Sequence, residues 1–109
     1  MASYTEVIKR KEAFQMTTVK DYLDERHDKL DFYTRAITNA HGQNHPEVFD
    51  VRQQYVRLCL DASNHKDLSE NFAKLRQTTK DYAIPGDVCP VFEATYHMLK
   101  TADAINAQI

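Results

Sequence analysis

Chain breakers are scarce in this chain of 109 residues, which contains only two glycines and three prolines. Glycine and proline are the residues that most often interrupt helices and strands, and folds with many strands need them at their turns. Long segments between so few breakers favour helices. The sequence therefore predicts an all-α fold, and at this length we expect residues 1–109 to form one domain with a single core.

Apolar residues recur at intervals of three and four along four long segments. The segments that we expect to be helical are 18–41, 46–62, 64–82 and 87–107. Thr18 can cap the first segment, and Gly42 can end it. Pro46 suits the first turn of the second segment, and Asp87 can cap the last. Four helices of about 17–23 residues with short connections predict an up-down-up-down four-helix bundle.

A short extra helix is expected before the bundle, over residues 3–14. Ser3 and Glu6 have the spacing of a capping box, and the apolar residues that follow lie near one helical face. Four large apolar residues fall outside the core stripes of the bundle: Phe32, Phe49, Val56 and Leu60. Either the N-terminal helix covers them, or they form a surface for a homodimer or another protein partner.

Composition and charge exclude several classes of partner. Fourteen Lys and Arg residues against sixteen Asp and Glu residues leave a net charge of −2, so the chain has no basic field to attract nucleic acid or an acidic membrane. No apolar run is long enough to span a bilayer or to form the core of a signal peptide. Cys59 and Cys89 show no metal-binding spacing and fit two free thiols in a reducing compartment. We therefore expect a cytoplasmic protein.

The five histidines divide into two groups. His97 points away from the stripe of its helix and is expected in solvent, and His45 is expected in a loop. His27, His41 and His65 each continue an apolar stripe, where a buried imidazole needs a partner and a metal ion can supply one. On one helix, fourteen residues separate His27 from His41 by about 21 Å, so these two cannot share a metal.

The candidate metal ligands are therefore His27 and His65, which come from different helices but lie nearer the same end of the predicted bundle. Asp31 and Glu70 are weaker candidates, because neither carboxylate replaces an apolar residue of a stripe. Iron is the only cofactor that this set suggests. No acid, base or nucleophile stands in a recognisable catalytic arrangement, so we assign no catalytic residue and lean against an enzyme.

Two stretches, residues 40–58 and 65–99, resemble the hemerythrin-like di-iron proteins of iron–sulfur cluster repair. The features that carry the resemblance are His41-Gly42, His45-Pro46-Glu47, His65, Tyr82 with Pro85, Cys89 and Phe92. The segment RHDKL (residues 26–30) resembles the first ligand helix of that family, with His27 in the ligand place. The resemblance implies a hemerythrin-like bundle in which His27 and His65 occupy ligand-type positions.

The chain departs from that family in its carboxylates. The family has a His-x-x-x-Glu segment before its later histidine helix and another after its last helix. Here Leu58-Cys59-Leu60-Asp61-Ala62 leads directly to Asn64-His65, and the printed sequence ends at Ile109 without the second segment. A di-iron centre within one chain would therefore lack both bridging-type carboxylates.

Three hypotheses for function follow. The first is a degenerate relative of the cluster-repair proteins that acts as a partner-binding or regulatory bundle in the response to stress. The second is an iron-binding protein that completes its site by dimerisation, with His27 and His65 joined by Glu70, Asp31 or Asp103. The third is an unrelated helical interaction module.

Overall fold

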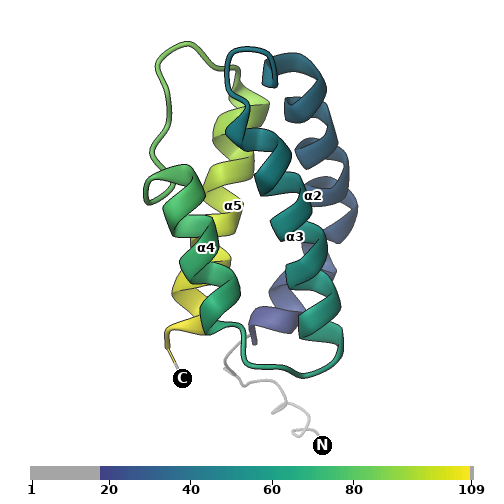
Figure 1. Cartoon of the computed structure of the whole chain (residues 1–109). Coiled ribbons are helices and arrows are strands. Elements are labelled where there is room, and N and C mark those ends of the chain that lie inside the picture. Colours follow the sequence, from purple (N-terminus) through teal and green to yellow (C-terminus); the bar gives the residue numbers. More distant parts are fainter. Residues whose placement is uncertain (1–17, 109) are drawn as a thin grey trace, which may run out of the picture.

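The computed structural model describes residues 18–108, which form four helices and no strand. The helices are α2 (Val19–His41), α3 (Glu47–Ser63), α4 (Ser69–Thr79) and α5 (Pro90–Asn106). Figure 1 shows each helix running opposite to the one before it. The predicted all-α helical bundle is confirmed for this part of the chain, and the helix expected over residues 3–14 lies outside it.

The first two helices begin and end where the sequence predicts, and the contacts explain why. The Thr18 hydroxyl accepts a hydrogen bond from the backbone N–H of Asp21 at 3.1 Å, which caps α2. Gly42 follows the last residue of α2 in a right-handed conformation, so it is needed for space rather than for a left-handed turn. A Cβ atom there would lie 2.5 Å from the Thr38 carbonyl oxygen and 2.7 Å from the Phe49 ring.

The helix predicted over residues 64–82 is wrong at both ends, because α4 has only 11 residues. At its start, the Asp67 carboxylate accepts hydrogen bonds from the backbone N–H and the hydroxyl of Ser69, which begins the helix there. At its end, Lys80 adopts a left-handed conformation with φ of 55°. His65 therefore lies in the α3–α4 connection, with φ of 57°, and not on a helix.

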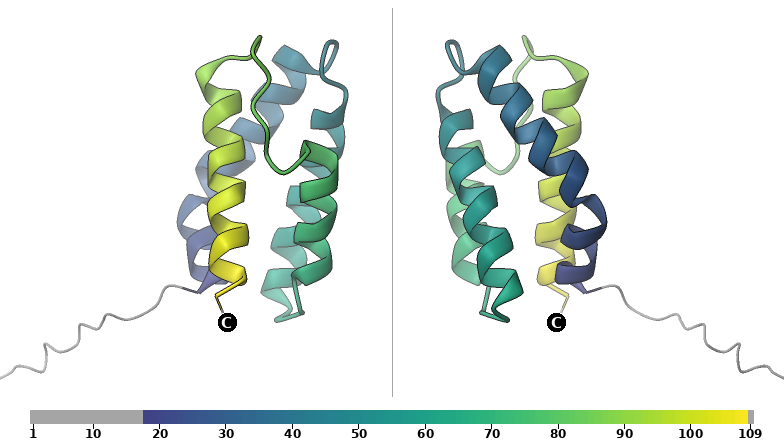
Figure 2. Two further views of the ribbon diagram at one scale, coloured as in Figure 1. Left: turned by 90° about the vertical axis from the view of Figure 1, so that its left-hand side faces the viewer. Right: turned by 90° about the vertical axis from the view of Figure 1, so that its right-hand side faces the viewer.

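The start of α5 also differs from the prediction. Cys89 is its N-cap residue and Pro90 occupies its first turn, so Asp87 lies outside the helix and does not cap it. Both views in Figure 2 show the α4–α5 connection (residues 80–89) at the same end of the bundle as the α2–α3 connection. Side chains from these two connections can therefore meet.

The core lies along the predicted stripes. Leu23, Leu30 and Ile37 of α2 are buried. The apolar residues of α3 that recur at intervals of three and four are all buried as well: Val48, Val51, Tyr55, Leu58 and Ala62. In α5, however, the stripe prediction missed Phe92 and Tyr96, which are fully buried, because that helix buries two neighbouring faces. Within residues 18–108, no helix combines the length and apolarity that crossing a membrane requires.

A buried carboxylate joins α4, the α4–α5 connection and α5. Both oxygens of Asp103 on α5 accept hydrogen bonds from the Arg76 guanidinium of α4 at 2.7 Å. The Tyr82 hydroxyl donates to the same carboxylate at 2.8 Å. Tyr82 is the last of three consecutive residues with positive φ, a conformation that costs about 1 kcal/mol or more at each non-glycine position. The Asp103 contacts thus hold a strained segment in place.

Replacing Asp103→Ala should lower the free energy of unfolding by about 2 kcal/mol, because the Tyr82 hydroxyl loses its partner inside the protein and Arg76 loses its anchor. Urea denaturation followed by circular dichroism measures this change. The matched control is Asp28→Ala, which removes an exposed carboxylate that makes no side-chain hydrogen bond among the described residues, and we expect it to stay within about 0.5 kcal/mol. Equal effects of the two substitutions would contradict the role of Asp103.

Candidate functional site

The structure corrects the expected burial of both candidate histidine ligands. His27 and His65 are exposed, so neither takes the place of a core residue. His27 lies in the third turn of α2, where its Nδ1 atom forms a 2.8 Å hydrogen bond with the buried Tyr55 hydroxyl of α3. Burial raises the pKa of that Tyr55 hydroxyl above its usual range. The stripe position of His27 thus reflects a hydrogen bond with a buried tyrosine of the neighbouring helix.

The two candidate carboxylate ligands, Asp31 and Glu70, contact residues other than His27 and His65. Asp31 pairs with Arg52 of α3 at 2.7 Å and with Arg35 of its own helix. The hydrogen bond from Arg52 is the main reason that the pKa of Asp31 lies below its usual value. Glu70 is exposed on α4, where it lines a pocket between α3 and α4. None of the described contacts brings these carboxylates to His27 or His65.

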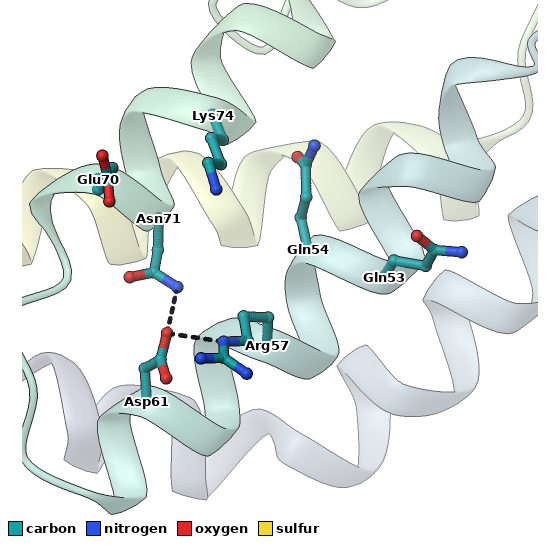
Figure 3. A pocket seen from close by; sticks show the side chains of 7 residues that line it. All are labelled: Gln53, Gln54, Arg57, Asp61, Glu70, Asn71 and Lys74. Carbon is teal, nitrogen blue, oxygen red and sulfur yellow. Dashed lines mark hydrogen bonds and ion pairs between the residues drawn. The ribbon is translucent and has the colours of Figure 1, made fainter.

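The pocket that Glu70 lines is polar on every side. It has a volume of about 400 Å³, and the residues around it are Gln53, Gln54, Arg57, Asp61, Glu70, Asn71 and Lys74. Figure 3 shows the side chains of α3 and α4 facing one another across it, with Asp61 accepting hydrogen bonds from Asn71 and Arg57. Among residues 18–108, no three His, Cys, Asp or Glu side chains are close enough together to hold a metal ion.

A second group of titratable residues gathers where the two connections meet, and we call it the His45 cluster: His41, His45, Glu47, Asp87 and Cys89. The His45 ring stands between two carboxylates, with Nδ1 3.2 Å from Glu47 and Nε2 2.9 Å from Asp87. The last residue of α2, His41, has its Nε2 atom 3.2 Å from the Cys89 sulfur. The rings of both histidines pack edge-on against Phe92.

The geometry of the His45 cluster favours a charged imidazole. Each ring nitrogen faces a carboxylate oxygen, and both can donate a hydrogen bond only when the ring carries two protons. The Asp87 carboxylate, and after it Glu47, raises the pKa of His45 above 6.5. The same contact lowers the pKa of Asp87 below 3.8. His45 therefore ties the α4–α5 connection to the start of α3 through a charge-assisted contact.

A pocket of about 470 Å³ opens beside the His45 cluster, and we call it the Tyr96 pocket. His45 and Glu47 form part of its lining, the end of α4 contributes Thr78 and Thr79, and α5 contributes Tyr96. The Tyr96 hydroxyl is buried, and no residue from 18 to 108 forms a hydrogen bond with it. Sequence reasoning missed this site, and only the spacing of His45 and Glu47 could have hinted at it.

The sequence left open whether the four apolar residues outside the stripes are covered or exposed, and the structure exposes all four of them. The exposed fractions are 63% for Phe32, 52% for Phe49, 49% for Val56 and 50% for Leu60. His97 is also exposed, as predicted, and His45 lies in a loop as expected. Cys59 and Cys89 are free thiols, and burial raises the pKa of Cys59 above its usual value.

Comparison with known proteins assigns no family to this arrangement. No protein-family model matches the chain, no curated protein is significantly similar to it, and no solved structure matches its fold significantly.

Stability should fall as the pH rises through the pKa of His45. That pKa is raised in the folded state, so the contact stabilises the protein fully below about pH 6.5 and contributes less as the imidazole loses its proton. Urea unfolding midpoints at about pH 5.5 and about pH 8.5 should differ more for the natural chain than for His45→Gln. The other four histidines are common to both proteins, so an identical pH dependence would show that His45 makes no such contact.

Proposed function

We propose that this chain is a partner-binding helical bundle, and that its partner is a second copy of the same chain. The observation that carries the proposal is the exposure of four large apolar side chains on the outer side of α2 and α3, which we call the apolar face: Phe32, Phe49, Val56 and Leu60. Monomeric proteins seldom expose a contiguous apolar surface of this kind.

Three of the four residues form one stripe along α3. Phe49, Val56 and Leu60 are spaced by seven and four residues, which places them on the same side of a helix. Phe32 follows Asp31, whose carboxylate contacts Arg52 of α3. Phe32 therefore lies on α2 at a level between Phe49 and Val56 of α3.

A second copy fits this face because the pattern can pair with itself. Two apolar helical stripes pack against each other with their side chains interlocked, and in a two-fold dimer the same surface is used twice. If the two α3 helices run antiparallel, Phe49 lies opposite Leu60 of the partner subunit, at both ends of the stripe. The small net charge of −2 adds little repulsion between the two copies.

The resemblance to the hemerythrin-like proteins contributes a narrower part of the proposal. The resemblance rests on the order of the sequence motifs, and with it we propose a reduced relative of that family that acts as a regulatory bundle in the stress response. Exposure of His27 and His65, together with the arginine partners of Asp31, favours protein contact over metal chemistry as the activity that remains.

The full chain should be a dimer at micromolar concentration, and Val56→Glu should raise its dissociation constant about thirtyfold or more, because a charge would be buried at the centre of the interface. Light scattering coupled to size-exclusion chromatography measures this mass. Ala73→Glu is the matched control, since it places the same charge at an exposed position of α4 and should leave the dimer intact. A chain that stays monomeric up to millimolar concentration would contradict the proposal and would favour residues 3–14 as the cover of the apolar face.

Iron content separates this proposal from the metal-binding alternative. After anaerobic incubation with ferrous iron and removal of the excess, we expect the dimer to retain much less than one iron ion per chain, because the candidate ligands do not meet. Elemental analysis on the fractions from size-exclusion chromatography gives this ratio. About one ion per chain in the natural protein, lost in both His27→Ala and His65→Ala, would establish instead the iron site completed by dimerisation.

A further inference from the structure

Cys89 and His41 form a pair in which a nucleophile lies beside a base. The two residues are 48 positions apart in the sequence, and the packing of α5 against α2 brings the Cys89 sulfur to 3.2 Å from His41 Nε2. Figure 1 shows the end of α2 and the start of α5 at the same end of the bundle. An imidazole at this distance can take the proton of a thiol as the sulfur attacks another molecule. The contact therefore gives Cys89 a route to reaction.

Two helix ends favour the charges that this proton transfer produces. Cys89 is the N-cap residue of α5, and His41 is the last residue of α2. The start of a helix favours a negative charge and the end of a helix favours a positive one. The transfer leaves a negative sulfur at the start of α5 and a positive imidazole at the end of α2. Asp87, which lies two residues before Cys89, is paired with His45 at 2.9 Å, so its charge is offset close to the sulfur.

The first turn of α5 can hold an oxygen atom that is bound to the sulfur. No side chain among residues 18–108 caps this helix, and Pro90 has no backbone N–H. The N–H groups of Val91 and Phe92 therefore have no partner within the helix. Such groups point toward the N-cap residue and bind anionic oxygen atoms.

Cys59 has different surroundings, although it is also a free and half-buried thiol. Its neighbour is the Tyr55 hydroxyl, and burial raises the pKa of its thiol above the usual value, which disfavours the reactive thiolate. Glu47 begins α3 at the end of the bundle where Cys89 lies, and it is separated from Cys59 by about 18 Å along the helix. The two sulfurs of one chain therefore lie too far apart to form a disulfide.

We propose that Cys89 is a site of oxidation by hydrogen peroxide, with His41 as its base. The sulfur attacks one peroxide oxygen, so an S–O bond forms while the O–O bond breaks. His41 Nε2 takes the thiol proton and gives it to the departing hydroxide, which leaves as water. The thiol is oxidised by two electrons to a sulfenic acid, and the peroxide is reduced. This site does not use the apolar face, so it stands or falls independently of the proposed dimer.

The two cysteines of one molecule provide the first test. The full-length protein is treated with hydrogen peroxide in the presence of dimedone, which traps sulfenic acids, and the label on each cysteine is measured by mass spectrometry of peptides. We expect Cys89 to be labelled about tenfold faster than Cys59. In concentrated urea this advantage should disappear, because unfolding separates Cys89 from His41. Equal rates in the folded protein, or an advantage that persists in urea, would overturn the proposal.

His41→Gln tests the base. Glutamine keeps a polar side chain at the end of α2 but cannot take the thiol proton, so labelling of Cys89 should fall to about the rate of Cys59. His97→Gln is the matched control, because it removes an exposed imidazole from the same helix as Cys89 and should leave both rates unchanged.

The rate at Cys59 also reports the fold of each variant, since unfolding would expose that thiol and speed its labelling. If His41→Gln loosens the fold, His41→Asn is the second variant, and the comparison of the natural chain with and without urea decides the proposal if neither variant folds. An unchanged rate at Cys89 in a folded His41 variant would refute the site.

Discussion

The Asp103 carboxylate is the contact on which the shape of this protein most depends. It takes one charged group out of water and satisfies it with the Arg76 guanidinium and the Tyr82 hydroxyl. A buried carboxylate is expensive unless its oxygens are bonded, and here both are. The left-handed residues 80–82 follow from it, because Tyr82 can reach α5 only if the chain turns sharply after Thr79.

The position of the α4–α5 connection decides in turn what the other end of the bundle contains. The connection brings Asp87 to His45, and its residues Ala83, Ile84 and Pro85 line the same pocket as Glu47. His45 then joins the connection to α3 through an imidazolium between two carboxylates. The site therefore depends on the fold at two levels: the buried Asp103 contact fixes where the connection begins, and the exposed His45 contact fixes where it ends.

Three of the five histidines in this chain contact polar side chains of other described residues, and none of these contacts forms a metal site. His27 contacts the Tyr55 hydroxyl, His41 contacts the Cys89 sulfur, and His45 contacts two carboxylates. A histidine on an apolar stripe can thus be explained by one polar partner on the neighbouring helix. The resemblance to the hemerythrin-like proteins predicts ligand-type positions for His27 and His65, and exposure at both positions weakens that reading.

Periodicity and capping residues predicted the helical class, the bounds of α2 and α3 and the position of four large apolar residues outside the core stripes, because these depend on neighbours three and four residues away. The bounds of α4 were harder to predict, because the Asp67–Ser69 contact and the left-handed Lys80 compete with helix formation over the same residues. Periodicity did not predict the burial of Phe92 and Tyr96, because α5 buries two neighbouring faces in the folded protein. The His45 cluster and the Tyr96 pocket were decided by tertiary structure alone, since Glu47 and Asp87 are forty residues apart in sequence and meet at His45 only when the strained connection folds back over the bundle.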